Sequence, residues 1–134
     1  MPITYRIDLP AALITTRCSG QVTLQEVQEH FRELARVWPP VDRLDVLLDL
    51  LDQTSLPGLS ELQEVAEEIE IRIGPHRFGR CAVITDQELI YESMRMFEVL
   101  VHRWFEAFRV FRTPLEALVW LAPKPDPSRT LTAQ

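Results

Sequence analysis

The chain has 134 residues, which is enough for one domain with a hydrophobic core and too few for two. Its composition is 46% hydrophobic and 25% charged, as in ordinary globular proteins, and no apolar stretch is long enough to predict a membrane-spanning helix. The formal net charge is −6, and residues 61–72 hold five glutamates against a single arginine. Nucleic acid is not expected as a partner, because phosphate binding needs a basic surface.

The N-terminus and the two cysteines predict a cytoplasmic protein. Residues 1–6 show no basic segment leading into an apolar run, so no secretory signal is expected. Cys18 and Cys81 both lie in predicted strands, which is typical of buried thiols in a reducing compartment rather than of a disulfide framework.

The first third of the chain predicts two strands and a helix. Residues 4–8 alternate polar and apolar side chains, Pro10 interrupts them, and residues 12–18 form a second extended run, so we expect an antiparallel pair. A helix with a 3.6-residue apolar period follows Thr23. Residues 38–40, Trp-Pro-Pro, end this helix because proline cannot continue the hydrogen-bond ladder.

The middle of the chain predicts a strand, a helix and another strand. Residues 44–51 are almost continuously apolar, which indicates a strand covered on both faces. An irregular segment over 52–59 leads to a helix over 61–73, which Gly74-Pro75 ends. Residues 80–85 predict a further buried strand.

The last third predicts the longest helix, a short strand and a final helix. The long helix covers about residues 87–104 and the strand about 109–111. Pro114 suits the first position of a helix that ends at Ala122. The proline-rich residues 123–134 are predicted to form a disordered C-terminal tail.

Four short signatures mark the predicted helix starts. In each, a hydroxyl side chain is followed three residues later by Glu or Gln, the pattern of a capping box. They are Thr23-x-x-Glu26, Ser60-x-x-Gln63, Thr85-x-x-Glu88 and Thr113-Pro114-x-Glu116.

The order of elements predicts an α/β fold. Strands that alternate with helices of this length pair in parallel through right-handed crossovers. The predicted order is β-β-α-β-α-β-α-β-α, a mostly parallel five-stranded sheet with four helices in one domain over residues 1–122.

Four segments carry a resemblance to a known family. They are Ser19-Gly20-Gln21-Val22-Thr23, the strand Val46–Leu50, the stretch Gly79–Ile84 and the ending Phe111–Leu121. In the order of their predicted elements and in the residue pattern of these segments, residues 3–122 resemble the SpoIIAA-like, or STAS-like, group of small bacterial domains. The resemblance implies a STAS-like fold and a non-enzymatic regulatory or protein-interaction module, with no cofactor.

The long helix over 87–104 is the first candidate for recognition. Its apolar residues form two stripes, which makes a wider face than packing on one sheet requires. The residues of this predicted face are Ile90, Met94, Met96, Phe97, Val101 and Trp104, and Leu89 and Leu100 extend the second stripe. Methionines and aromatics favour an adaptable contact, and we expect a homodimer or docking of a partner protein.

Two alternatives remain for this face. One is a carrier of a small apolar or lipid-like ligand bound under the helix, which the architectural likeness of SpoIIAA-like folds to lipid-binding CRAL-TRIO domains implies. The other is a helix wedged deeply between the sheet and its neighbours, with no partner at all.

The loops after the strands are the second candidate. Ligands of parallel sheets meet the carboxyl ends of the strands. The polar residues expected there include Asp49, Asp52, Thr54, Ser55, Ser60 and Asp86. Carboxylates and hydroxyls at one edge suit a cation or a phosphate, and the alternative is that they serve only turns and caps.

A phosphorylation switch is implied by the resemblance. Anti-sigma-factor antagonists of the STAS group carry a phosphorylatable serine in an Asp-Ser-Ser-Gly-Leu motif at the entry to the second helix. Asp52, Ser55, Gly58 and Leu59 occur in that order here, but at a different spacing. Phosphate on Ser55 or Ser60 would lie near a helix N-terminus, which favours an anion.

Catalysis has little support in the sequence. The histidines lack the spacing that zinc requires, and no base accompanies either cysteine. An enzyme that uses Asp49, Asp52 and Asp86 is the least favoured alternative, because no nucleophile or metal constellation accompanies them. We expect no enzymatic activity and no metal site.

Overall fold

The computed structural model describes residues 2–74 and 76–122. The helices and strands follow the predicted order, and a short 3₁₀ turn, η1, precedes the last strand. The elements are β1 (Ile3–Asp8), β2 (Leu13–Gly20), α1 (Leu24–Arg36), β3 (Leu44–Gln53), α2 (Leu59–Ile73), β4 (Phe78–Ile84), α3 (Glu88–Val101), η1 (His102–Trp104), β5 (Ala107–Phe111) and α4 (Pro114–Leu121). The α/β prediction is therefore confirmed. The predicted tail over residues 123–134 and Pro75 lie outside the described residues.

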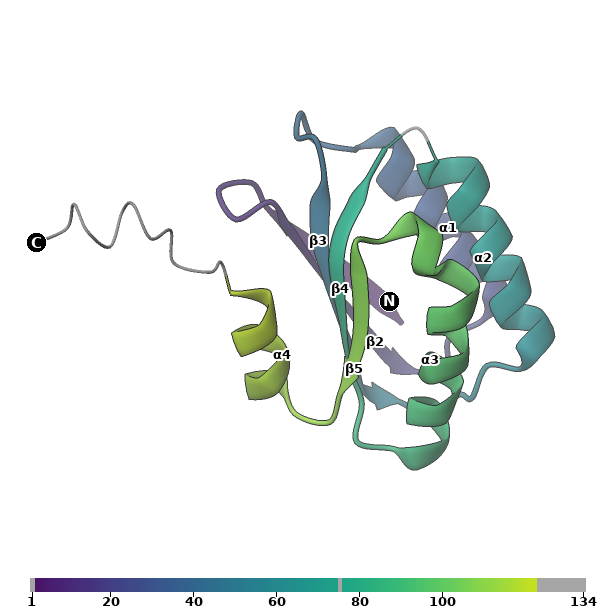
Figure 1. The fold of residues 1–134 in the computed structure, drawn as a ribbon. Helices are drawn as coiled ribbons and strands as arrows, with labels where there is room; N and C mark the ends of the chain where they lie inside the picture. The colour runs from purple at the N-terminus through teal and green to yellow at the C-terminus, as the bar shows by residue number, and fades with distance from the viewer. Residues whose placement is uncertain (1, 75, 123–134) are drawn as a thin grey trace, which may run out of the picture.

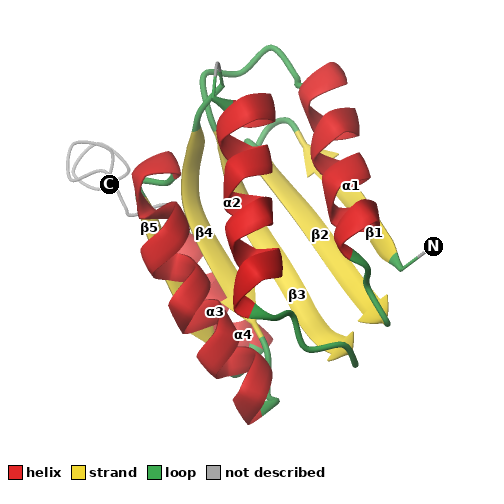
Figure 2. Ribbon diagram, turned by 90° about the vertical axis from the view of Figure 1, so that its right-hand side faces the viewer, coloured by secondary structure: helices red, strands yellow, loops and turns green. Residues whose placement is uncertain are grey.

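The five strands form one sheet in the order β1-β2-β3-β4-β5. β1 and β2 are antiparallel, as the alternating N-terminal pattern predicts, and the other three pairs are parallel. Each successive crossover steps to the next strand in the same direction, so right-handed connections place α1, α2 and α3 on one face. Figure 2 shows these three helices in front of the sheet, and Figure 1 shows α4 alone on the opposite side.

The strands divide their side chains between two hydrophobic layers. The larger layer lies between the sheet and α1–α3, and it includes Ile14, Val46 and Val83. The smaller layer, which includes Leu47 and Ala82, lies against α4. Neighbouring residues of one strand point to opposite faces, so Val46 and Leu47 serve different layers. This division agrees with the prediction that residues 44–51 are covered on both sides.

One of the four predicted capping boxes is complete, at α1, and at α4 only the hydroxyl half of the predicted box forms. At α1, the Glu26 amide donates to the Thr23 hydroxyl at 3.2 Å, and the Thr23 amide donates to the Glu26 carboxylate at 2.9 Å. At α4, the Thr113 hydroxyl accepts from the Glu116 amide at 3.4 Å and donates to the Glu116 carboxylate at 2.9 Å. Pro114 occupies the first turn, as predicted.

The other two capping predictions are wrong. α2 begins earlier, with Gly58 as its N-cap, because the Glu61 carboxylate reaches back to the Gly58 amide at 3.2 Å. Ser60 consequently lies within the first turn. At α3, Gln87 is the N-cap, and the fully buried Thr85 accepts from the Gln87 amide at 3.3 Å instead of capping the helix.

Within the described part of the chain, no helix combines the length and the apolar character needed to cross a bilayer.

Candidate functional site

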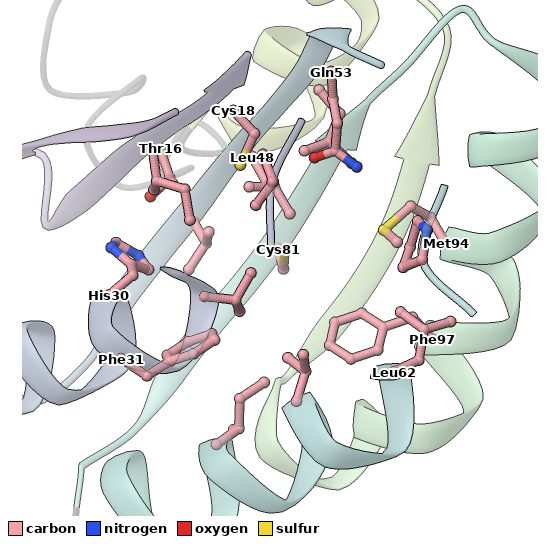
Figure 3. Close-up of a pocket in the computed structure, with 18 of the residues that line it drawn as sticks. Thr16, Cys18, His30, Phe31, Leu48, Gln53, Leu62, Cys81, Met94 and Phe97 are labelled. Carbon is pink, nitrogen blue, oxygen red and sulfur yellow. The ribbon is translucent and has the colours of Figure 1, made fainter. Parts of the chain in front are cut away.

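A pocket of about 150 Å³ lies between the sheet and the layer of α1, α2 and α3. Side chains from all five strands and from these three helices line it, and Figure 3 shows 18 of them. Its main apolar members are Ile14, Val27, Phe31, Leu34, Val46, Leu48, Leu62, Val65, Ile69, Met94 and Phe97. An engineered apolar cavity of about 150 Å³ in an unrelated protein binds benzene, so the space suits a molecule of one ring.

The sequence builds this lining from two periodicities. Alternation along β2 turns Ile14, Thr16 and Cys18 toward the helices, and all three are buried. Helical periodicity turns Val27 and Phe31, four residues apart on α1, to one face. The pocket therefore lies within the larger hydrophobic layer instead of on the surface of the molecule.

The pocket reaches the surface at the carboxyl edge of the parallel strands. The exposed Thr23 and the half-buried Pro57 and Glu61 line it at the starts of α1 and α2. Two loops meet there, because the Ser55 hydroxyl accepts from the Val22 amide at 3.0 Å and donates to the Val22 carbonyl at 3.4 Å. This edge is the one at which ligands of parallel sheets are expected.

Few polar side chains face the pocket, and they are almost all neutral. Burial lowers the pKa of His30 below its ordinary value, so this ring is uncharged at pH 7. Burial raises the pKa of Cys18 to about 12 and also raises the pKa of Cys81, so both remain thiols. Glu61 alone among the lining residues carries a formal charge, and it lies at the mouth, bonded to the Gly58 amide.

Thr16 and Gln53 are the buried polar residues of the lining, with exposed fractions of 4% and 6%. Both are labelled in Figure 3. The Gln53 side-chain amide donates to the Ser55 carbonyl at 3.0 Å. Thr16, His30 and Gln53 were not among the predicted site residues. The available signal was a threonine at an inward position of β2, between Ile14 and Cys18.

The predicted face of the long helix is divided in the structure. Ile90, Met94, Phe97 and Val101 are buried in the main hydrophobic layer, and only Met94 and Phe97 reach the pocket. Trp104 lies in η1, half-buried against the same layer. The buried four are occupied within the chain, so they cannot present a surface to another protein in this conformation.

The second stripe of the same helix points outward. Met96 and Leu89 of this stripe are 48% and 68% exposed, and Val99, which the prediction did not include, is 71% exposed. Leu100 is half-buried. One face of α3 thus packs on the sheet while the other is free for contact with another molecule.

The predicted loop residues do not form a single cluster. Asp49 accepts from the Leu51 amide at 3.0 Å, and Asp52 forms an ion pair with Arg17. Ser55 alone of the predicted loop residues lines the pocket. The exposed residues of the set are Asp52, Thr54, Ser60 and Asp86. Across residues 2–74 and 76–122, no three acidic, histidine or cysteine side chains converge in a way that could hold a metal ion.

Comparisons with known proteins place the chain in a family. A family model described as SpoIIAA-like matches residues 13–122. The chain therefore belongs to the SpoIIAA-like family, as its resemblance implied. No curated protein matches the sequence significantly.

A similar solved structure supports the fold. The crystal structure of an uncharacterised protein of the DUF3478 family from Shewanella loihica PV-4, with a SpoIIAA-like fold, superposes with a TM-score of 0.63. The two sequences are 18% identical, and the match covers 90% of this chain and 92% of the other. At this identity the likeness shows the fold alone.

Proposed function

We propose that this SpoIIAA-like domain is a non-enzymatic binding module that holds a small, largely apolar molecule between its sheet and its helices. The observation that carries the proposal is the pocket of about 150 Å³, lined almost entirely by apolar side chains and open at the edge near Thr23. Such pockets, with few polar groups, are typical of small-molecule sites.

The volume limits the size of the ligand. Pockets for drug-sized molecules usually enclose about 300–1,000 Å³. This pocket is smaller, so a single ring or a short branched chain fits better than a long lipid. The pocket volume thus restricts the size of the apolar ligand that the sequence suggested. The proposed site also involves α1 and α2 in addition to α3.

Two methionines on α3 provide a test with an internal control. Met94 lines the pocket, whereas Met96 lies two residues away and is 48% exposed. With methyl-labelled methionine, toluene added to the full chain should shift the NMR signal of the Met94 methyl group in a saturable manner and leave that of Met96 in place. An unchanged Met94 signal, or equal changes at both residues, would contradict the proposal.

A second proposal is that the domain docks another protein, or a second copy of itself, through the outer face of α3. Leu89, Met96 and Val99 give this face three exposed apolar side chains. Exposed apolar residues on one helix face favour docking, and family membership is consistent with a regulatory interaction module.

Sedimentation tests the homodimer form of this proposal. At high micromolar concentration the chain should sediment as a dimer, and Val99→Glu should shift it to the monomer. Val119→Glu is the matched control, because Val119 is 68% exposed on α4, on the opposite side of the sheet. A clean monomer before substitution would rule out the homodimer.

Phosphorylation near α2 also remains a proposal. Ser60 is exposed in the first turn of α2, where helix amides and the dipole favour an anion. Ser55 is less accessible, since its hydroxyl bonds Val22 in both directions. Phosphoprotein mapping from the native host should find modification at Ser60 before Ser55, and absence of phosphate from both under all growth conditions would remove the idea.

A further inference from the structure

Thr16 carries the one hydroxyl that lies deep in the lining of the pocket. It sits near the middle of β2, where its backbone pairs with Tyr5 of β1 and Leu48 of β3. Thr16 is only 4% exposed, and its side chain faces the helical layer. A threonine at an inward strand position brings a polar atom into an otherwise apolar layer, where it needs a hydrogen-bond partner.

The Thr16 hydroxyl lies at the part of the lining that includes His30 (Figure 3). It makes no hydrogen bond with another described residue. Among these residues, however, every side-chain nitrogen or oxygen that protein atoms enclose fully has a hydrogen-bond partner. The Thr16 oxygen must therefore touch open space, and the open space that this side chain lines is the pocket. A ligand or a water molecule placed there would supply the missing partner.

The remaining lining disfavours anionic ligands. His30 is neutral, both cysteines are protonated, and the Glu61 carboxylate at the mouth repels anions. A carboxylate taken into this pocket would lose its hydration and meet no cation in return. A hydroxyl on the ligand loses less on leaving water, and it recovers a hydrogen bond at Thr16.

We propose that the pocket selects a neutral single-ring molecule bearing one hydroxyl, such as a phenol, and that Thr16 is the residue that recognises the hydroxyl. This inference rests on the proposed function, because it assigns the chemical class of the ligand held in the same pocket. Thr16 and the ligand hydroxyl each donate and accept, so one hydrogen bond forms in either direction.

The test compares p-cresol, toluene and benzoate on the full chain by calorimetric titration. Thr16→Val keeps the shape of the side chain and replaces the hydroxyl with a methyl group. It should weaken p-cresol binding about ten-fold while leaving toluene binding unchanged or stronger, since a hydrogen bond of ordinary strength changes an affinity by about that factor. Thr16→Ser, which keeps the hydroxyl, should retain the preference for p-cresol.

Thr15→Val is the matched control, because Thr15 neighbours Thr16 on β2 and is not part of the lining. Its ratio of p-cresol to toluene affinity should equal that of the unmodified chain. If both ligands bind and Thr16→Val leaves the ratio unchanged, this inference is overturned while the proposed function stands. If neither ligand binds the unmodified chain, the proposed function fails and this inference fails with it. Tighter binding of benzoate than of p-cresol would overturn the neutral-ligand assignment, whatever the variants do.

Discussion

Filling the pocket should stabilise the empty protein. Val27 on α1 and Val65 on α2 both line the space and are half-buried, so Val27→Leu and Val65→Leu each add one methylene toward it. A closed apolar cavity costs about 24 cal/mol per Å³, so about 3.6 kcal/mol is the upper limit for what filling a space of about 150 Å³ could recover. Two buried methylenes at about 0.8 kcal/mol each should return about 1.6 kcal/mol of this.

Leucine also favours helices more than valine does, so the stability gain needs a control. Val119→Leu makes the same substitution on α4 at a position that is 68% exposed, and it isolates the helix-propensity gain of a few tenths of a kcal/mol. Urea unfolding measures the free energy of unfolding of each variant, with an unchanged m-value expected.

The free energy of unfolding of the double variant should rise by more than twice the increase seen in the control. The double variant should also bind toluene more weakly than the unmodified chain. A destabilised double variant with ordinary m-value would refute the reasoning, because overpacking destabilises only where no usable space exists.

Three further predictions follow from individual side chains. The pKa of His30 is lowered in the folded state by burial beside Tyr5, against the opposing influence of Glu33, so the unfolded chain binds the proton more readily. Stability should therefore fall as pH drops below about 6.5, and His30→Phe should reduce the change in urea midpoint between pH 7.5 and 5.5. Cys18 and Cys81 should react with a thiol reagent at pH 8 far more slowly in the folded chain than in urea, because both are buried with raised pKa values. Gly79→Ala should destabilise the fold by about 1–3 kcal/mol in urea unfolding, since its new methyl group would collide with the Asp45 carboxylate.

The fold could be predicted from the sequence because strong local signals agree with one another. The apolar run of β3, the proline stop after Trp38 and the Thr23 capping box each act over a few residues, and each lies where the structure has the corresponding element. Once the element order is known, short connections and right-handed crossovers leave few topologies for a parallel sheet. Local chemistry and handedness together therefore determine this architecture.

The start of α2 shows where local rules are insufficient. Ser60 has the residue type that caps prefer, but Glu61 bonds the amide of Gly58 and the helix begins two residues earlier than the serine would place it. At α3, Thr85 is drawn into the core at the end of β4, which removes its hydroxyl from the capping position. At α2 a hydrogen bond therefore determines where the helix begins, and at α3 burial of the predicted cap residue does so.

The pocket could not be predicted because it depends on the distance between the sheet and the helices that cover it. Periodicity identifies Val27, Phe31 and Leu62 as inward-facing residues, but it does not report how closely α1 and α2 approach the strands. Thr16 was the residue that sequence could have flagged, since a polar side chain at an inward strand position needs a reason. The two stripes of α3 posed a related problem: the pattern showed two apolar faces without showing which one meets the sheet.

α3 is the element on which the two proposed functions meet. Its inner face brings Met94 and Phe97 to the pocket, and its outer face carries Met96 and Val99 to the surface. A ligand in the space under this helix would contact the inner residues. If that alters docking on the outer face by some factor, the docked partner must alter ligand affinity by the same factor, because the coupling free energy is shared. Ligand affinity measured for the unmodified chain and for Val99→Glu, at the high micromolar concentration of the sedimentation test, separates the two cases: equal affinities mean independent sites, and a difference gives the coupling free energy.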